Sequence, residues 1–306
     1  MSMRNAIAVM VAIQLTGCAT NSHPGQSAPP SLLAGPGVTV FAAGDIADCR
    51  KQAPSSTMAA RSAEFVATEL AADAGAVVLA LGDNVYQSGT AAEFADCYGP
   101  TWGRFKSRTW PVPGNHEYYS KDALGYYDYF GAQAGPQQRG YYSIEVGQWH
   151  VMSLNSNLKG DAQQAQLDWL RADLAAHPTH CALAYWHHPQ YSSGGHGNND
   201  QMRAAWAMLA EAGTELILSG HDHDYERFSP VDALGKRDVA KGMRQFVVGT
   251  GGAELSPLAF ARAGSETVNN ATYGVLKLQL KPAGYEWEFI SVAGEPFHDA
   301  GSAACH

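Results

Sequence analysis

Five short motifs of polar residues follow apolar runs along this sequence of 306 residues. Together they supply carboxylate, imidazole, amide and phenol groups, which are ligands for borderline or hard metal ions. A carboxylate has two oxygens and can therefore hold two metal ions about 3.5–4 Å apart. We expect a two-metal centre built from the motifs GDIAD (44–48), GDNVY (82–86), GNHE (114–117), AYWHHP (184–189) and GHDHDYER (220–227).

The ordered set of motifs is more specific than any one of them. A Gly-Asp pair after a strand is usually a turn, and a His pair is commonly structural. The pair His221 and His223 is a stronger signal, because alternate residues of an extended segment aim two imidazoles at neighbouring positions. A glycine opens four of the five motifs, and it allows the backbone to turn sharply and to approach a metal ion closely.

Apolar runs predict the buried strands that position these motifs. Four such runs end in a polar group at or just past their carboxyl end, which is where open α/β sheets bind ligands. These four are 38–43, 76–81, 182–186 and 215–219. Further strands are expected at 141–146, 149–154, 245–249 and 273–281, and helices at 55–73, 161–176 and 200–212.

Two of these elements carry more detailed expectations. Asp161 is placed to cap the N-terminus of the helix 161–176. In the segment 273–281, leucines alternate with lysines and glutamine, which predicts a strand with one solvated face. Trp287 and Phe289 alternate with glutamates in what the pattern indicates is the last strand.

The ordered motifs resemble the calcineurin-like metallophosphoesterase superfamily, and more narrowly its purple acid phosphatase branch. That branch carries a tyrosine three residues after the second aspartate, and Tyr86 follows Asp83 in this way. The resemblance covers about residues 38–300. It implies an α/β fold, a four-layer α/β/β/α sandwich in which two central mixed sheets are flanked by helices.

Carried over residue by residue, the resemblance assigns seven metal ligands. Asp83 would bridge two metal ions, and three further residues would bind each ion. The first group is Asp45, Tyr86 and His223, and the second is Asn115, His187 and His221. Because a phenolate suits Fe(III), the implied cofactors are two metal ions per chain, Fe(III) at the Tyr86 site and a divalent ion (Zn, Mn or Fe) at the other.

The second of these sites has two adjacent candidate histidines. His187 directly follows its predicted strand, and in related proteins the ligand histidine is followed by one residue and then proline, as here with Pro189. His187 is therefore preferred, and His188 remains an alternative ligand.

The resemblance also implies which residues face the substrate. His116 would face the phosphate, stabilise it and protonate the leaving oxygen. His196 lies nine residues after His187 in a glycine-rich loop, where purple acid phosphatases place another such histidine. Glu117 and Glu226 are expected to orient loops and ligands rather than to react.

The implied reaction is hydrolysis of a small phosphomonoester by attack of a metal-bound hydroxide. One alternative is a phosphodiesterase of the same fold. Another is a catalytically silent, lipid-anchored protein that binds metal or phosphate, although all seven expected ligand positions are filled. Serine-based chemistry fits poorly, because no serine lies with a base in a recognisable nucleophile elbow.

The composition agrees with a metal-assisted reaction on an anion. With 20 Lys and Arg against 29 Asp and Glu, the formal net charge is −9. The sequence lacks the basic footprint of a nucleic-acid-binding protein. Metal ions would supply the local positive charge that an acidic protein needs to bind a phosphate. Nothing in the sequence indicates an oligomeric state.

The N-terminus reads as a targeting segment. Residues 1–17 have the pattern of a signal peptide, and the stretch ending at Cys18 resembles the bacterial lipobox. The expectation is an exported chain anchored to the lipid bilayer of the cell envelope through acylated Cys18, in the periplasm or outer membrane if the host is Gram-negative. An ordinary secretory signal is the alternative. Residues 18–37 read as a flexible tether and 38–306 as one catalytic domain.

Setting Cys18 aside leaves four cysteines, which allow three disulfide pairings in an oxidising compartment. Cys49 and Cys97 each follow a metal-type motif. The favoured pairing is therefore Cys49 with Cys97 and, by elimination, Cys181 with Cys305.

Overall fold

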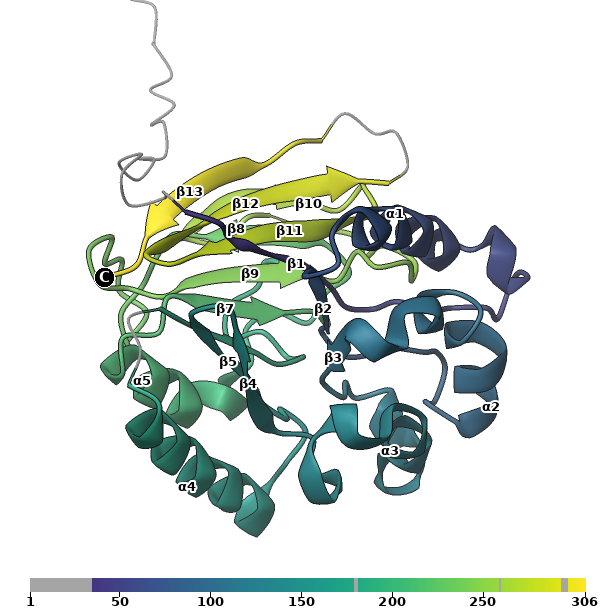
Figure 1. The fold of residues 1–306 in the computed structure, drawn as a ribbon, viewed down its shortest axis with the longest axis horizontal. Helices are drawn as coiled ribbons and strands as arrows, with labels where there is room; N and C mark the ends of the chain where they lie inside the picture. The colour runs from purple at the N-terminus through teal and green to yellow at the C-terminus, as the bar shows by residue number, and fades with distance from the viewer. Residues whose placement is uncertain (1–34, 179–180, 259, 293–296) are drawn as a thin grey trace, which may run out of the picture.

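The computed structural model describes residues 35–178, 181–258, 260–292 and 297–306. The predicted signal peptide, Cys18 and nearly all of the predicted tether lie outside the described residues. Two β-sheets form the centre of the fold, and helices lie on part of the outer face of each (Figure 1).

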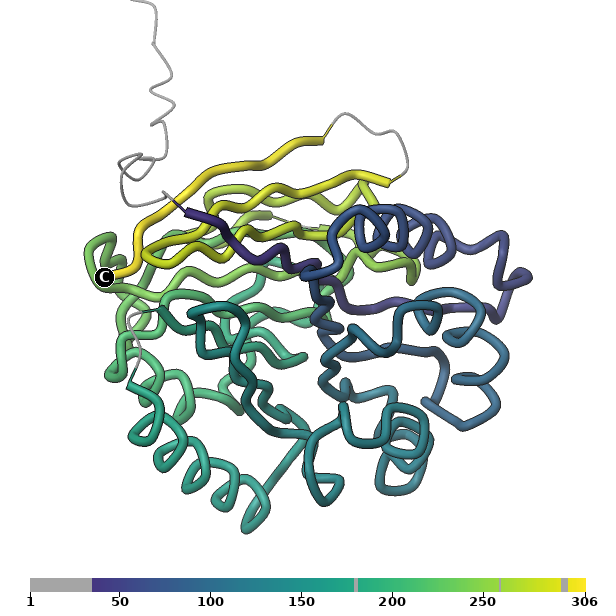
Figure 2. Tube along the Cα trace, viewed as in Figure 1, coloured from purple at the N-terminus to yellow at the C-terminus, as the bar shows by residue number. Residues whose placement is uncertain are grey.

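The first sheet joins strands from the two ends of the chain. Its order is β13-β12-β11-β1-β2-β3, in which β1, β2 and β3 are parallel and the others antiparallel. Figure 2 shows the early strand β1 lying beside the late strand β11. The bounds are β1 (Val38–Ala43), β2 (Val77–Ala80), β3 (Thr109–Pro111), β11 (Gly274–Lys281), β12 (Gly284–Ser291) and β13 (Ala300–Ala304).

The second sheet contains seven strands in the order β10-β8-β9-β7-β6-β5-β4. Strands β5, β6, β7 and β9 are parallel, so their carboxyl ends lie at one edge. The bounds are β4 (Tyr142–Val146), β5 (Trp149–Ser153), β6 (Ala182–Tyr185), β7 (Leu216–Ser219), β8 (Tyr225–Phe228), β9 (Arg244–Val248) and β10 (Ser265–Asn269).

Helices form the two outer layers. In Figure 1, α1, α2 and α3 lie on one flank and α4 and α5 on the other. Their bounds are α1 (Met58–Ala72), α2 (Ala91–Glu93), α3 (Leu124–Phe130), α4 (Gly160–Ala176) and α5 (Arg203–Glu211). One apolar cluster fills the space between the two sheets and under α1. A second apolar cluster lies between the second sheet and the helices α4 and α5. The predicted four-layer α/β/β/α architecture is confirmed.

Two details of the predicted elements are wrong. Helix α4 begins at Gly160 after Lys159, which makes no side-chain capping hydrogen bond. Asp161 lies in the first turn, where its charge favours the helix dipole but caps nothing. The strand with Trp287 is not the last, because β13 follows and pairs with β12. The residues AGSAA of β13 have no large apolar side chains, so they carry no alternation that predicts a strand.

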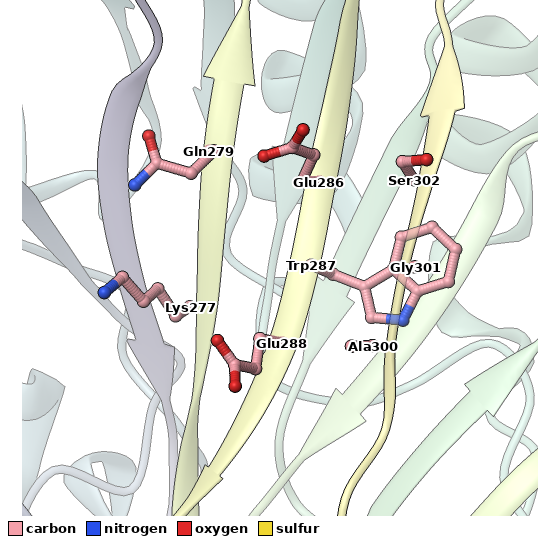
Figure 3. A pocket seen from close by; sticks show the side chains of 8 residues that line it. All are labelled: Lys277, Gln279, Glu286, Trp287, Glu288, Ala300, Gly301 and Ser302. Atoms are coloured by element: carbon pink, nitrogen blue, oxygen red, sulfur yellow. The ribbon is translucent and has the colours of Figure 1, made fainter. Parts of the chain in front are cut away.

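The outer face of β11 and β12 is polar, as the alternation predicted. Lys277 lies opposite Glu288 and Gln279 lies opposite Glu286 across the two strands. These four side chains line a pocket that continues over β13, seen in Figure 3. Opposite charges on facing strand positions stabilise a sheet. This pocket therefore belongs to a solvated sheet face and contains none of the predicted site residues.

Two disulfides join Cys49 to Cys97 and Cys181 to Cys305, which confirms the favoured pairing. The bonds span sequence separations of 48 and 124 residues. Bonds that close loops of this length stabilise a fold by about 4–5 kcal/mol each in the chain-entropy account. Disulfides persist in oxidising compartments, so both bonds fit an extracellular or envelope protein.

No helix in the described ranges combines the length and the apolar character that crossing a bilayer requires.

Candidate metal centre

The predicted ligands meet where the carboxyl ends of the parallel strands of both sheets come together. The loops after β1, β2 and β3 bring the carboxylate, phenol and amide side chains from the first sheet, and the residues after β6 and β7 bring the three histidines from the second. Each of the two predicted ligand groups therefore combines residues from both sheets. The structure brings together all seven predicted metal ligands: Asp45, Asp83, Tyr86, Asn115, His187, His221 and His223.

Asp83 lies between the two groups. Its Oδ2 atom is 3.2 Å from Nε2 of His187 and 3.4 Å from the hydroxyl of Tyr86. One carboxylate oxygen therefore touches a predicted ligand of each metal ion, which is the position that a bridging ligand needs.

The first group is compact. The Tyr86 hydroxyl lies 3.0 Å from Oδ1 of Asp45 and 3.1 Å from Nε2 of His223. His223 Nε2 is in turn 3.3 Å from Oδ1 of Asp45. Three donor atoms of three different chemical types thus form a triangle.

The second group has the same spacing. His187 Nε2 lies 3.2 Å from Oδ1 of Asn115 and 3.2 Å from Nδ1 of His221. Ligands bound at about 2.1 Å in a tetrahedral or octahedral shell lie about 3.0–3.4 Å apart. The donor atoms of both groups therefore fit two metal ions in type and in spacing.

Hydrogen bonds on the far side of the rings orient two histidines. His187 Nδ1 lies 2.9 Å from the carbonyl oxygen of Leu81, and His223 Nδ1 lies 2.7 Å from that of Glu254. With a proton on Nδ1 donated to the carbonyl, each ring turns the lone pair of Nε2 to the centre. This is the second contact that metal-binding histidines usually make.

Three of the predicted ligands have a backbone conformation that non-glycine residues rarely adopt. The φ angles are 57° for Asp45, 46° for Asp83 and 74° for His221. Aspartate and histidine tolerate this region better than most residues, and such conformations cluster at functional sites. The turn carries each side chain inward from the end of its strand.

Two glycines allow the loops to approach this closely. A Cβ atom on Gly114 would lie 2.1 Å from Oδ1 of Asp83. A Cβ on Gly82 would lie 2.6 Å from Nδ1 of His187, and Gly82 itself has a φ of 87°. Both positions support the expectation that glycines let the backbone pass close to the centre.

Neighbouring charges set the protonation of the centre. Burial alone would lower the pKa of His187, but Asp83 raises it to about 9. Burial likewise opposes protonation of His223, and Asp45 raises the pKa of that ring to about 9. In the metal-free protein these imidazoles hold protons that balance the buried carboxylates. Metal ions would take the place of those protons, so binding releases them.

Tyr86 is held as a neutral phenol by the protein alone. Burial, together with the charges of Asp45 and Asp83, raises the pKa of Tyr86 well above its ordinary value. A phenolate at this position therefore needs a cation beside it.

The alternative ligand His188 has a different environment. Its Nδ1 lies 2.8 Å from the hydroxyl of Ser156, and its ring packs against that of His221 with centroids 4.4 Å apart. Burial and the neighbouring His187 lower the pKa of His188 to about 3. The ring of His187, rather than that of His188, contacts Asp83, which favours His187 as the ligand.

His116 lies over the centre between two aromatic rings. Its ring centroid is 4.5 Å from that of Tyr86 and 4.6 Å from that of Tyr119. The backbone N–H of His116 donates to Asp83, and Nδ1 lies 2.6 Å from the carbonyl oxygen of Gln87. Its Nε2 atom lies 3.8 Å from Oδ2 of Asp83, so it faces the centre, and the side chain as a whole is 17% exposed.

His196 reaches the centre from another loop, and a buried aspartate holds it. The ring of His196 is 4.2 Å from that of His221. Asp222 accepts hydrogen bonds from the backbone N–H of His196 at 2.8 Å and faces its Nδ1 at 3.0 Å. Asp222 also accepts from the Ser192 hydroxyl. Sequence reasoning missed Asp222, although its position between His221 and His223 could have indicated it.

The two glutamates orient loops, as the sequence indicated. Glu117 is buried and accepts hydrogen bonds from the backbone N–H groups of Gly114, Asp83 and Asn84, at 2.6, 3.0 and 2.8 Å. It thereby ties the loop after β3 to the loop after β2. Burial and the charge of Asp83 raise the pKa of Glu117 to about 8. Glu226 accepts from the backbone N–H of Ser193 at 2.7 Å.

Comparison with known proteins agrees with this architecture. Residues 39–225 match the calcineurin-like phosphoesterase family, which is more than half of the chain. The chain is 27% identical over 248 residues to purple acid phosphatase 21 of Arabidopsis thaliana, covering 70% of this chain and 56% of the relative. It is 30% identical over 192 residues to purple acid phosphatase 15 of the same plant, covering 51% and 36%.

Solved structures show the same fold. A purple acid phosphatase, PPD1, from yellow lupin seeds superposes with a TM-score of 0.72 at 17% identity, covering 92% of this chain and 55% of that one. GAP50, described as the anchor in the inner membrane complex of Plasmodium, superposes with a TM-score of 0.68 at 13% identity, covering 89% and 90%.

The chain belongs to the calcineurin-like phosphoesterase family, and its relatives support the purple acid phosphatase-like branch that the motifs indicate. All seven predicted metal ligands lie within the region that matches the family. The chain spans about half the length of the first curated relative and about a third of the second.

Replacing Glu117 by glutamine tests its orienting role. At a pH above about 8 the ionised carboxylate of Glu117 accepts with both oxygens. The amide has one acceptor oxygen and turns an NH2 group toward backbone donors, which leaves a buried N–H unpaired at a cost of about 1–3 kcal/mol. We expect a lower melting temperature and a metal affinity lowered about 10–100-fold. Metal content after dialysis against chelator buffers measures this. Glu64→Gln, on the exposed face of α1, is the matched control. Equal metal retention by Glu117→Gln and wild type would contradict the role.

Proposed function

We propose that the protein is a dinuclear metal-dependent phosphatase that hydrolyses phosphomonoesters. The observation that carries the proposal is the position of Asp83 Oδ2, in contact with His187 of one ligand group and Tyr86 of the other. A structural site for one ion has no use for a carboxylate shared in this way. Membership of a phosphoesterase family supports a phosphate ester as the substrate.

Each metal ion has a proposed set of ligands. Asp45, Tyr86 and His223 would hold Fe(III), because the buried phenol needs a strongly charged cation to ionise. Asn115, His187 and His221 would hold a divalent ion, Zn, Mn or Fe, and Asp83 would bridge the two. When bound, the two ions offset the charge of the phosphate and lower the pKa of a water molecule for attack on phosphorus.

The proposed role of His116 is to stabilise the phosphate and to protonate the leaving oxygen. The Gln87 carbonyl accepts the proton of Nδ1 and fixes the ring, so that a protonated His116 presents Nε2–H to the phosphate. The rings of Tyr86 and Tyr119 pack against it and restrict its rotation. A donor held in place before the reaction loses little entropy in the transition state.

His196 is proposed to contact the same phosphate from the side of His221. Asp222 holds both the backbone and the ring of His196, so the loop presents the ring at a fixed place. With Nδ1 engaged by the carboxylate, Nε2 is the atom available to a substrate oxygen. The substrate would then lie between His116 and His196.

The proposal includes an exported protein. Both disulfides support an oxidising compartment. We propose in addition that acylation of Cys18 anchors the chain to the cell envelope, since the sequence before that cysteine resembles a lipobox.

Comparing two substrates tests the function. We expect the metal-loaded protein to hydrolyse p-nitrophenyl phosphate faster than the bis ester, because the centre binds a dianionic phosphate. Asp83→Ala should lose both metal ions and the activity. A preference for the bis ester would identify a phosphodiesterase. Two bound metal ions without turnover of either ester would indicate a catalytically silent binding protein, and full activity of Asp83→Ala would place the reaction elsewhere.

Replacing His116 by alanine separates its proposed role from metal binding. The variant removes a donor but no proposed ligand, so we expect two metal ions to remain and kcat to fall about 10²–10³-fold. His298→Ala, an exposed histidine before β13, is the control. Parallel metal analysis and kinetics measure both effects. Loss of metal together with activity would show that His116 helps to hold the ions instead.

The colour of the protein tests the metal at the Tyr86 site. A phenolate bound to Fe(III) gives a visible charge-transfer band, and we expect this band in the iron-loaded wild type. Tyr86→Phe should lose the band while keeping the shape of the side chain. Two zinc ions and no band in protein purified from its natural source would show that Tyr86 does not bind iron.

A further inference from the structure

A second cluster of metal-binding side chains lies away from the proposed centre. It consists of His150 on β5, with Asp173 and His177 at the C-terminal end of α4. His150 pairs with Ala182 at the start of β6, whereas His187 follows the end of that strand. Ala182 and His187 are five residues apart, which corresponds to about 16 Å of extended chain. The cluster therefore lies near the amino-terminal ends of the parallel strands of the second sheet, and the proposed centre lies at their carboxyl ends.

The geometry brings two imidazoles to one carboxylate. His150 Nε2 lies 2.7 Å from Oδ2 of Asp173. His177 Nδ1 lies 3.4 Å from Oδ1 of Asp173 and 2.9 Å from its backbone carbonyl oxygen, and the two imidazole rings stack with centroids 4.5 Å apart. The three potential ligand atoms all lie within 4.8 Å of one another. Asp173 lies in the last turn of α4, and His177 is the first residue after the helix, four positions further on. The spacing i, i+4 is one that helices use to present a pair of metal ligands.

The second nitrogen of His150 is already fixed by a carboxylate. Its Nδ1 lies 2.6 Å from Oε1 of Glu145, on the paired strand β4. The hydroxyl of Ser143 donates to Oδ1 of Asp173 at 2.7 Å. A carboxylate behind a histidine holds its ring in the tautomer whose free nitrogen binds a metal.

We propose that His150, Asp173 and His177 bind a divalent transition-metal ion, most suitably Zn²⁺. Two imidazoles and one carboxylate are a common zinc ligand set, which leaves a further position for water. The ion would lie at the C-terminal end of α4, where the helix dipole favours positive charge. The His177 side chain is 47% exposed, so the ion can reach the site from solvent, while His150 is buried.

The hydrogen bonding of His150 in the metal-free protein is consistent with this site. Burial alone would lower the pKa of His150, but hydrogen bonds to Asp173 and Glu145 raise it. The Nε2 proton shared with Asp173 occupies the place of the ion and leaves when the ion binds. The bound ion would join α4 to β5 and would thereby stabilise this edge of the sheet.

Zinc titration of the Asp83→Ala variant tests the proposal without interference from the main centre. We expect about one zinc ion per chain and a melting temperature raised by about 5 °C at saturating zinc. Adding His177→Ala should abolish both effects, and Glu145→Gln should weaken binding about 10–100-fold. His306→Ala is the matched control, because His306 also faces a carboxylate, Glu215, with no second imidazole beside it in the described residues.

Zinc binding by this cluster can also be measured in protein that keeps the Asp83 side chain. Wild type saturated with zinc should then hold about one ion more than His177→Ala, measured by elemental analysis after gel filtration. Equal zinc content in the two proteins, or zinc binding to Asp83→Ala that His177→Ala leaves unchanged, would overturn the proposal. Loss of phosphatase activity has no bearing on either result, so the two proposals fail separately.

Discussion

The structure depends on holding buried carboxylates and imidazoles within contact of one another. Beyond the ends of β1 and β2, the two following loops continue the parallel pairing of the strands. Asp45 N–H donates to the carbonyl of Gly82 and Ile46 N–H to that of Asp83, at 3.0 and 2.9 Å. This pairing fixes the two aspartates side by side although both have positive φ. Each such conformation costs of the order of 1 kcal/mol, which the surrounding hydrogen bonds and buried strands offset.

The same closeness bears on the proposed binding of an anionic substrate by an acidic protein. The net charge of −9 would repel a phosphate, and no basic motif compensates for it. In the metal-free protein, Asp45 and Asp83 hold protons on His223 and His187. Two metal ions at the same positions would replace those protons with a larger and more concentrated positive charge. Burying the carboxylates of Asp45 and Asp83 costs free energy, and the same two carboxylates attract cations to the site.

The sequence predicted the side chains of the candidate site more completely than the contacts and strands that hold them in place. The proposed ligands are side chains in short motifs, and the apolar runs before them predict the strands that converge there. The contacts that orient His187, His116 and His223 go to backbone carbonyls, which every residue has and no sequence pattern marks. Asp222 acts through a loop 26 residues away, a contact that only the fold creates. The strand β13 was missed because five small residues bury too little apolar surface to alternate visibly.

The two histidine clusters differ in what holds them in place, and this difference predicts how each tolerates change. In the main centre, strand ends, backbone carbonyls and positive-φ turns position the ligands, so the fold itself builds the site. At the end of α4, contacts of side chains contribute more: Glu145 orients His150, and His177 lies beside both the carboxylate and the backbone carbonyl of Asp173. Removing half-exposed His177 leaves the helix and the sheet intact, whereas removing Asp83 strips the centre of the carboxylate that both groups contact. The outer cluster can therefore be lost or gained by single substitutions, while the inner one is tied to the architecture.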